Sequence, residues 1–254
     1  MKIFPADYKD IALADKIALP FTYFDNFTVP PGSGNFSGHP DFTALRLIFL
    51  DIDEVLTSSK TLVTSGYYPH HTTPKDGEIN IEVVYPESID KEAVTLINKL
   101  CAATSSMIVL SSSWRIGLNC LQIWSLFESL GLDPMYLLGR TDSEGGANGQ
   151  GRGEEIQRFM RELTISSITR QRMIHDNYLL AQYGGLGKTE ISSYVIIDDS
   201  QDMLPEQLPN LVLVNAVEGL SLSDTIYAGR ILIKDERFGL TNLCASKPDL
   251  FVWQ

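Results

Sequence analysis

The stretch of this chain best suited to chemistry is residues 45–53, Leu-Arg-Leu-Ile-Phe-Leu-Asp-Ile-Asp, where an apolar run ends in two aspartates one residue apart. The apolar part predicts a buried strand, and the alternation of side chains along a strand sends Asp51 and Asp53 to roughly the same side. Two carboxylates held this close repel each other unless a cation or a shared proton intervenes. The pair therefore indicates metal-assisted chemistry on an anionic substrate.

Two later apolar runs also end in polar side chains. Residues 107–110 lead into Ser111, and residues 194–197 lead into Asp198 and Asp199. Ligands of open α/β sheets bind at the carboxyl ends of the strands, so we expect all three strand ends to meet at one crevice. A set of hard oxygen ligands with no cysteine and little histidine favours Mg²⁺ as the bound ion.

The elements that position these residues alternate between strands and helices. Apolar residues at helical spacing predict helices, and short apolar runs predict further strands. The helices are expected at residues 89–103, 118–130, 154–163 and from about Ser221, and the further strands at 135–138 and 211–214. This alternation, with strands that are apolar throughout, predicts an α/β fold with a parallel sheet covered by helices on both faces.

Two segments lie outside this alternation. Residues 1–44 are rich in proline, glycine and aromatic side chains, and we expect an N-terminal extension that packs on the core. Residues 45–254 would form one domain, with residues 57–86 inserted after the first strand as a small cap or flap. His70 and His71 in this flap are interpreted as solvated residues, because no further side chain at ligand spacing supports a metal site.

Composition restricts the classes of function. The formal net charge of −12, from 20 Lys+Arg against 32 Asp+Glu, disfavours nonspecific binding to DNA or anionic membranes. The cysteines, Cys101, Cys120 and Cys244, have neither zinc spacing nor a disulfide framework, so we expect a reducing compartment, the cytoplasm. No apolar stretch reaches the ~18 residues needed to span a bilayer, and the first residues do not resemble a secretory signal.

Taken in order, the motifs resemble those of phosphohydrolases of the haloacid dehalogenase (HAD) superfamily. The resemblance rests on an apolar run with Asp-x-Asp-x-Val, an apolar run with serine, a basic residue that opens a helix, and an apolar run with Asp-Asp. The finer text of residues 109–115, 151–156 and 194–199 is similar to the HAD domain of Swiss Army Knife RNA repair proteins. The resemblance covers about residues 45–225 and implies a Rossmann-like HAD fold.

The resemblance also implies roles for the four aspartates. Asp51 would be the nucleophile that forms an aspartyl-phosphate. Asp53 would protonate the leaving oxygen, then activate the hydrolytic water, and would ligate the metal through its backbone carbonyl. Asp198 and Asp199 would hold Mg²⁺ directly or through water, which lets an anionic nucleophile approach an anionic phosphate.

Two further side chains are expected to contact the phosphoryl group. Ser111 would hydrogen-bond one of its oxygens, and Arg152, at the start of a helix, would offset its charge. The motifs leave neighbouring residues open as alternatives for these contacts: Ser112, Ser113, Arg115 and Arg140. Trp114 and Trp124 are expected to be packing residues.

The substrate is left open between two classes. The RNA-repair resemblance favours a nucleotide or a nucleic-acid end phosphate. Glu54 stands where the superfamily often has glycine, and the order Asp-x-Asp-Glu resembles phosphatases of protein substrates. A catalytically silent HAD-fold binding module is the competing class. Residues 184–189 resemble a Walker loop, but Gln182 replaces its first glycine, so no ATP site is expected.

Overall fold

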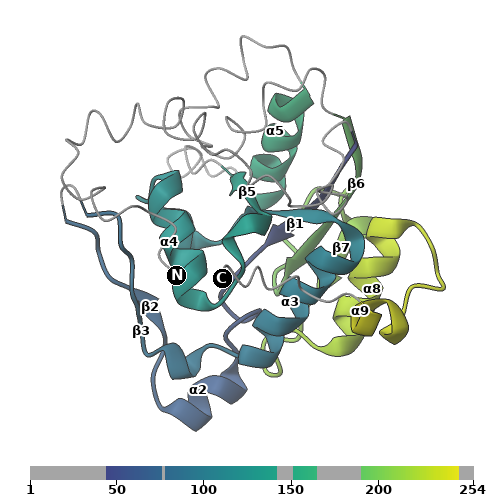
Figure 1. The fold of residues 1–254 in the computed structure, drawn as a ribbon. Helices are drawn as coiled ribbons and strands as arrows, with labels where there is room; N and C mark the ends of the chain where they lie inside the picture. The colour runs from purple at the N-terminus through teal and green to yellow at the C-terminus, as the bar shows by residue number, and fades with distance from the viewer. Residues whose placement is uncertain (1–43, 76–77, 142–150, 165–189, 246–254) are drawn as a thin grey trace, which may run out of the picture.

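A five-stranded parallel sheet forms the centre of the protein (Figure 1). The computed structural model describes residues 44–75, 78–141, 151–164 and 190–245. The strands are β1 (Ala44–Leu50), β4 (Ser106–Leu110), β5 (Leu137–Arg140), β6 (Glu190–Asp198) and β7 (Leu211–Leu213). They pair in the order β5-β4-β1-β6-β7, and each of these pairs is parallel. The predicted parallel α/β sheet is confirmed.

The register of the sheet places the carboxyl ends of its three central strands, β4, β1 and β6, at the same level. Leu50 of β1 pairs with Leu110 of β4 and with Ile197 of β6. The residues that come next in the three strands are Asp51, Ser111 and Asp198. The backbone N–H of Asp51 donates to the carbonyl of Ile197 (3.1 Å), and that of Ser111 donates to the carbonyl of Leu50 (2.9 Å). Segments far apart in the chain therefore present their polar side chains side by side.

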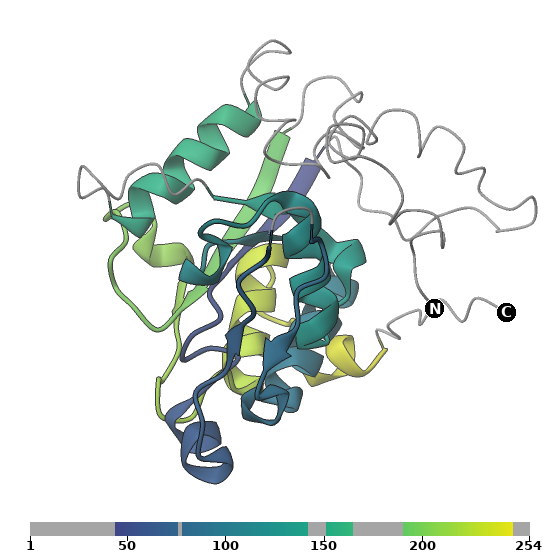
Figure 2. The same cartoon turned by 90° about the vertical axis from the view of Figure 1, so that its left-hand side faces the viewer.

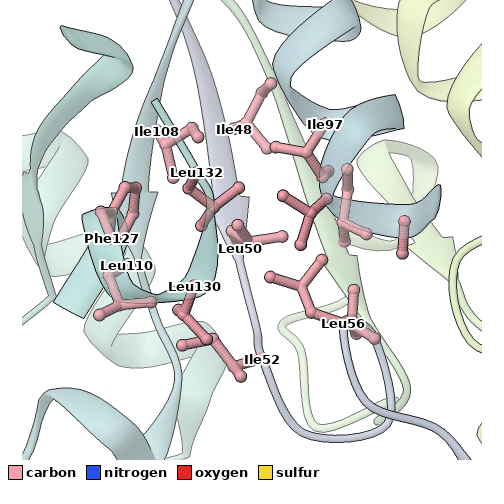
Figure 3. Close-up of a cluster of buried hydrophobic side chains, with 14 of the residues drawn as sticks. Ile48, Leu50, Ile52, Leu56, Ile97, Ile108, Leu110, Phe127, Leu130 and Leu132 are labelled. Atoms are coloured by element: carbon pink, nitrogen blue, oxygen red, sulfur yellow. The ribbon is translucent and has the colours of Figure 1, made fainter. Parts of the chain in front are cut away.

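Helices cover both faces of the sheet, as Figure 2 shows, with α5 (Arg152–Thr164) on the side opposite to α3 (Lys91–Thr104), α4 (Cys120–Leu130) and α8 (Leu222–Ile233). The core on the α5 side includes Leu47, Phe49, Met107, Ile156 and Phe159. The core on the other side includes Ile48, Leu50, Ile97, Ile108 and Phe127 (Figure 3). Each such side chain contributes about 1.5–3 kcal/mol when fully buried, so both faces of β1 are held firmly.

Side-chain caps define the ends of the helices. Asp90 accepts from two backbone N–H groups at the start of α3, and Asn119 and Gln122 form a capping box at the start of α4. Gly131 ends α4 in the left-handed conformation (φ 84°), directly after the predicted last residue of the helix at 118–130. Ser221 caps α8, which α9 (Leu240–Ala245) follows. Within the described residues, short 3₁₀ turns lie at Pro86–Ser88, Ser113–Arg115, Pro134–Tyr136 and Leu208–Asn210.

The flap after β1 contains α2 (Ser59–Ser65) and a two-stranded antiparallel ribbon of β2 (His70–His71) and β3 (Val83–Val84). The helix is not predicted by the sequence pattern. Residues 79–85 alternate apolar and polar at first, as strands do, but only Val83 and Val84 of this run pair with β2, and backbone N–H groups of the run also donate to side chains of α4. Ile81 N–H donates to Ser125 Oγ (3.1 Å), and Val83 N–H donates to Ser129 Oγ (2.8 Å).

Some expectations fall outside the described residues. The N-terminal extension and the Walker-like residues 184–189 are among them. The division of the chain into an extension and one catalytic domain therefore stays a prediction.

Candidate active site

Three carboxylates gather at the carboxyl ends of β1 and β6. Asp51, Asp198 and Asp199 each offer an oxygen within 4.8 Å of the oxygens of the other two. Asp198 is fully buried and Asp51 is nearly so. Mutual repulsion in so little water requires a compensating positive charge. The cluster is the meeting of strand ends that the sequence predicts.

Arg152 provides part of that charge. Its Nη1 lies 2.9 Å from Asp51 Oδ1 and 2.6 Å from Asp198 Oδ2. Burial lowers the pKa of Arg152, but Asp51 and Asp198 outweigh burial and raise it above its ordinary value. The guanidinium therefore bridges the two strand ends, and its predicted contact with a phosphoryl group stays a prediction.

The start of α5 is fixed on the loop after β6. Gly153 N–H donates to the carbonyl of Asp202 (3.0 Å), and Gln207 Nε2 donates to the carbonyl of Gly153 (2.8 Å). A Cβ on Gly153 would lie 2.5 Å from Leu204 N, a contact that real side chains do not make. Glycine thus allows the close approach that places Arg152, the first residue of the helix, against the carboxylates.

The carboxylate cluster fits a divalent cation. Burial raises the pKa of Asp198 to about 6, although Arg152 opposes this shift. Burial and then Asp51 raise the pKa of Asp199. One arginine bridges two of the three carboxylates, which leaves an excess of negative charge, and the donors are hard oxygens of the kind that Mg²⁺ prefers. Asp51, Asp198 and Asp199 are therefore the side chains that would hold Mg²⁺.

Asp53 has different surroundings, although it lies only two residues after Asp51. Trp114 Nε1 donates to its Oδ1 (2.8 Å), and Ser113 Oγ donates to its Oδ2 (3.1 Å). Burial raises the pKa of Asp53, and the hydrogen bond from Trp114 partly opposes this shift. The carboxylate of Asp53 is not part of the cluster of Asp51, Asp198 and Asp199, although the sequence predicts it near the metal. Ligation of a metal through its backbone carbonyl stays a prediction.

The three serines after β4 differ in their partners. Ser111 is fully buried, and its Oγ has no hydrogen-bond partner within the described part of the chain. Ser112 Oγ accepts from the Trp114 backbone N–H (3.4 Å), whereas Ser113 Oγ serves Asp53. A buried hydroxyl without a partner is costly, so Ser111 is the serine with a hydroxyl left to bind a ligand, and its predicted contact with phosphate stays a prediction.

Arg115, one of the alternatives for the phosphate contact, has protein partners of its own. Its guanidinium is buried and donates to the carbonyls of Thr141 (2.9 Å), Ser111 (2.8 Å) and Ser112 (2.5 Å). It also pairs with Glu155 of α5 at 2.5 Å. These contacts join the ends of β4 and β5 to the helix that carries Arg152. Arg140, the other alternative, is the last residue of β5 and half-buried.

The flap contacts two residues next to Asp53: Glu54, which follows it in the chain, and Trp114, which donates to its carboxylate. Tyr68 Oη donates to Glu54 Oε1, and this bond together with burial raises the pKa of Tyr68 to about 12. The ring of His71 lies edge-on to Trp114, with centroids 5.7 Å apart. Glu54 has a left-handed backbone (φ 59°), a conformation that favours glycine. Tyr68 and the indole N–H of Trp114 are site features that the sequence pattern did not reveal.

Comparison with known proteins agrees with this architecture. A family model described as the HAD domain in Swiss Army Knife RNA repair proteins matches residues 47–225. No curated protein and no solved structure matches the chain. Among the helices of the described residues, none is both long and apolar enough to cross a membrane. The matched span contains every motif that forms the crevice, and the chain therefore belongs to the HAD superfamily, in the family of HAD domains found in Swiss Army Knife RNA repair proteins.

Proposed function

We propose that the protein is a Mg²⁺-dependent phosphomonoester hydrolase that works through an aspartyl-phosphate on Asp51. Membership of the HAD family already implies a phosphatase-type hydrolase. The observation that carries the finer proposal is the gathering of Asp51, Asp198 and Asp199 within 4.8 Å, with Arg152 in contact with two of them. This arrangement can hold both a divalent cation and the phosphoryl group that Asp51 attacks.

Bound Mg²⁺ would neutralise charge on the phosphate and on the nucleophile, so that two anions can meet. The side chains perform the remaining steps. Arg152 neutralises charge on the transferring group, and the hydroxyl of Ser111 donates to one of its oxygens. A carboxylate oxygen of Asp51 attacks phosphorus, the bond from phosphorus to the leaving oxygen breaks, and Asp53 gives its proton to that oxygen.

Hydrolysis of the aspartyl-phosphate reverses the use of Asp53. The Asp53 carboxylate takes a proton from a water molecule while the water oxygen attacks phosphorus. The bond from phosphorus to Asp51 breaks, inorganic phosphate leaves, and the Asp51 carboxylate is regenerated. Asp53 is again protonated, so the cycle closes without any other reactant than water.

The first experiment tests the nucleophile. Purified protein with Mg²⁺ should release phosphate from p-nitrophenyl phosphate, and chelation with EDTA should stop turnover. Asp51→Asn should lower kcat by at least ~10³-fold, because an amide is a poor nucleophile. Asp235→Asn is a suitable control, since Asp235 lies on an exposed turn and pairs with Arg237. Mass spectrometry after acid quenching should find phosphate on the peptide that contains Asp51 in the active protein.

The substrate proposal is a phosphate on the end of a nucleic acid or on a nucleotide, with a phosphoprotein as the other class. The family description supports the first class. Values of kcat/KM for a 3′-phosphorylated oligonucleotide, free nucleotides and a phosphotyrosine peptide would rank them. Turnover of the peptide alone would transfer the proposal to phosphoproteins. No turnover of any phosphoester with Mg²⁺ present would favour the silent binding module.

A further inference from the structure

We propose that Trp114 is a positioning residue for proton transfer, and that with Ser113 it assigns the transferable proton of Asp53 to a single oxygen, Oδ2. The proposal rests on the proposed function, in which Asp53 is the acid and base. It goes further by naming the oxygen and the two side chains that select it. Neither side chain needs to contact the substrate.

The two oxygens of Asp53 have chemically different partners. Oδ1 accepts from the indole N–H of Trp114 at 2.8 Å, which is a hydrogen bond of ordinary length. Oδ2 lies 3.1 Å from the hydroxyl of Ser113. An indole N–H can only donate, whereas a hydroxyl can donate or accept. A proton on Oδ1 would make this oxygen a much weaker acceptor for the indole N–H, whereas a proton on Oδ2 is compatible with Ser113, whose hydroxyl can rotate to accept.

The chemical nature of these partners suits a group that must be protonated and deprotonated in turn. A guanidinium in the same place would favour the carboxylate strongly and oppose protonation. The indole and the hydroxyl are neutral and satisfy Asp53 in both states. Over one turnover, Oδ2 loses its proton to the leaving oxygen and regains one from water, while the Oδ1 hydrogen bond persists.

The indole ring is itself held from several directions. Trp114 is 7% exposed and belongs to the core on the α3 and α4 side of the sheet. Ser112 Oγ accepts from its backbone N–H, and the His71 ring of the flap packs edge-on against it. Asp53, by contrast, lies on a turn in which the N–H groups of Val55 and Leu56 donate to Ile52. A rigid donor thus fixes an acid on a loop.

The experiment compares leaving groups. Trp114→Phe keeps an aromatic ring and removes the N–H, and kcat/KM covers the steps up to phosphoryl transfer. For an alkyl phosphate, whose leaving oxygen requires a proton, we expect kcat/KM to fall ~100-fold, the lower end of general-acid effects. For p-nitrophenyl phosphate, whose leaving group departs as an anion, a loss of roughly threefold or less is expected.

Trp124→Phe is the matched control. Trp124 is 8% exposed, belongs to the same core, and its indole nitrogen has no hydrogen-bond partner among the described residues. This variant should change both substrates equally and slightly. Thermal unfolding of both variants would report any general loss of structure.

Ser113→Ala gives an independent test on an exposed residue, in case Trp114→Phe folds poorly. It should lower alkyl phosphate turnover more than aryl phosphate turnover. Equal losses for the two substrates in both variants would overturn the positioning role while leaving the phosphatase proposal intact. If Asp51→Asn were inactive while Trp114→Phe lost the same factor of kcat/KM for alkyl and aryl phosphates, the phosphatase proposal would stand and the positioning role of Trp114 would fall.

Discussion

The two sides of the crevice treat chemically identical residues differently. On the side of α5, Asp51 and Asp198 pair with the guanidinium of Arg152 and lie beside Asp199. On the side of the flap, Asp53 meets only an indole N–H and a hydroxyl among its hydrogen-bond partners in the described residues. A cationic partner suits the carboxylate that we propose attacks phosphorus, whereas neutral partners suit the one that we propose exchanges a proton. Under this proposal the surroundings of each aspartate, not its residue type, divide the two roles.

The different surroundings of Asp51 and Asp53 depend on where β1 ends. Asp51 still donates its backbone N–H to Ile197 of β6, so its side chain stays in register with Asp198. One residue later the chain turns, because three successive N–H groups after Glu54 donate to the carbonyl of Ile52. The turn moves Asp53 away from the carboxylate cluster and toward the loop after β4. Two residues of chain are thus enough to give Asp51 and Asp53 different partners, as the two roles that we propose for them require.

Arg152 provides the largest expected effect on the charged side, apart from loss of the nucleophile itself. Arg152→Ala should lower kcat/KM for phosphomonoesters ~10²–10³-fold, because the charge that faces the phosphoryl group is lost. Arg152→Lys should recover part of this loss, since a lysine supplies charge but not the two-sided contact of a guanidinium. Steady-state kinetics with p-nitrophenyl phosphate would measure both variants.

A control on the same helix tests whether the effect is local. Arg161, in the last turn of α5, donates to Gln157 at an exposed position. Arg161→Ala should keep nearly full activity. If Arg152→Ala were as active as Arg161→Ala, the contrast between a cationic and a neutral side of the crevice would lose its basis.

The approach of α5 to the loop after β6 gives the next largest effect. In Gly153→Ala the new methyl group would press on the Leu204 backbone nitrogen, so either the helix or the loop must move. We expect a loss of about 1–3 kcal/mol in the free energy of unfolding, as for overpacked sites. A ~10-fold lower kcat should accompany it, because small displacements of a charged group are costly in catalysis. Denaturant unfolding and kinetics would measure the two changes.

Gly151→Ala is the comparison for this variant. There a Cβ would meet the side chain of Asp202 at 2.8 Å, and a side-chain end can move more easily than backbone. A smaller loss of stability is therefore expected. Equal losses of unfolding free energy in the two variants would mean that the close approach of Gly153 to the Leu204 backbone does not determine the position of Arg152.

The sequence allowed the fold and the carboxylate cluster to be predicted because both depend on local patterns. Apolar runs determine the strands, parallel pairing determines the edge at which they end, and the aspartates follow each run directly. The start of α5 was placed two residues late, at Glu154 instead of Arg152. Gly153, in the first turn of this helix, is a poor helix former, and its packing on the loop after β6 explains its presence there.

Residues on the neutral side escaped prediction because their roles depend on contacts between distant loops. A tryptophan after a strand indicates burial, and Trp114 is indeed buried. The sequence does not reveal which acceptor its indole N–H binds. Tyr68 contacts Glu54 from the flap, and the sequence pattern does not predict how the backbone of the flap folds. The sequence favoured Arg152 for the phosphate contact and kept Arg115 as an alternative. In the structure, backbone carbonyls surround Arg115, whereas Arg152 contacts carboxylates, so the proposal keeps Arg152.

The smallest expected effect concerns the flap. His71→Ala removes the ring that packs edge-on against Trp114 but leaves the indole hydrogen bond to Asp53 in place. Aromatic pairs of this kind contribute about 0.5–1.5 kcal/mol, so we expect kcat/KM for an alkyl phosphate to fall by about two- to tenfold. The value for p-nitrophenyl phosphate should change less. His70→Ala is the control, because His70 packs against Tyr85 and not against Trp114. A larger loss for His70→Ala would show that the flap acts on the substrate itself, not through the residue that orients the acid.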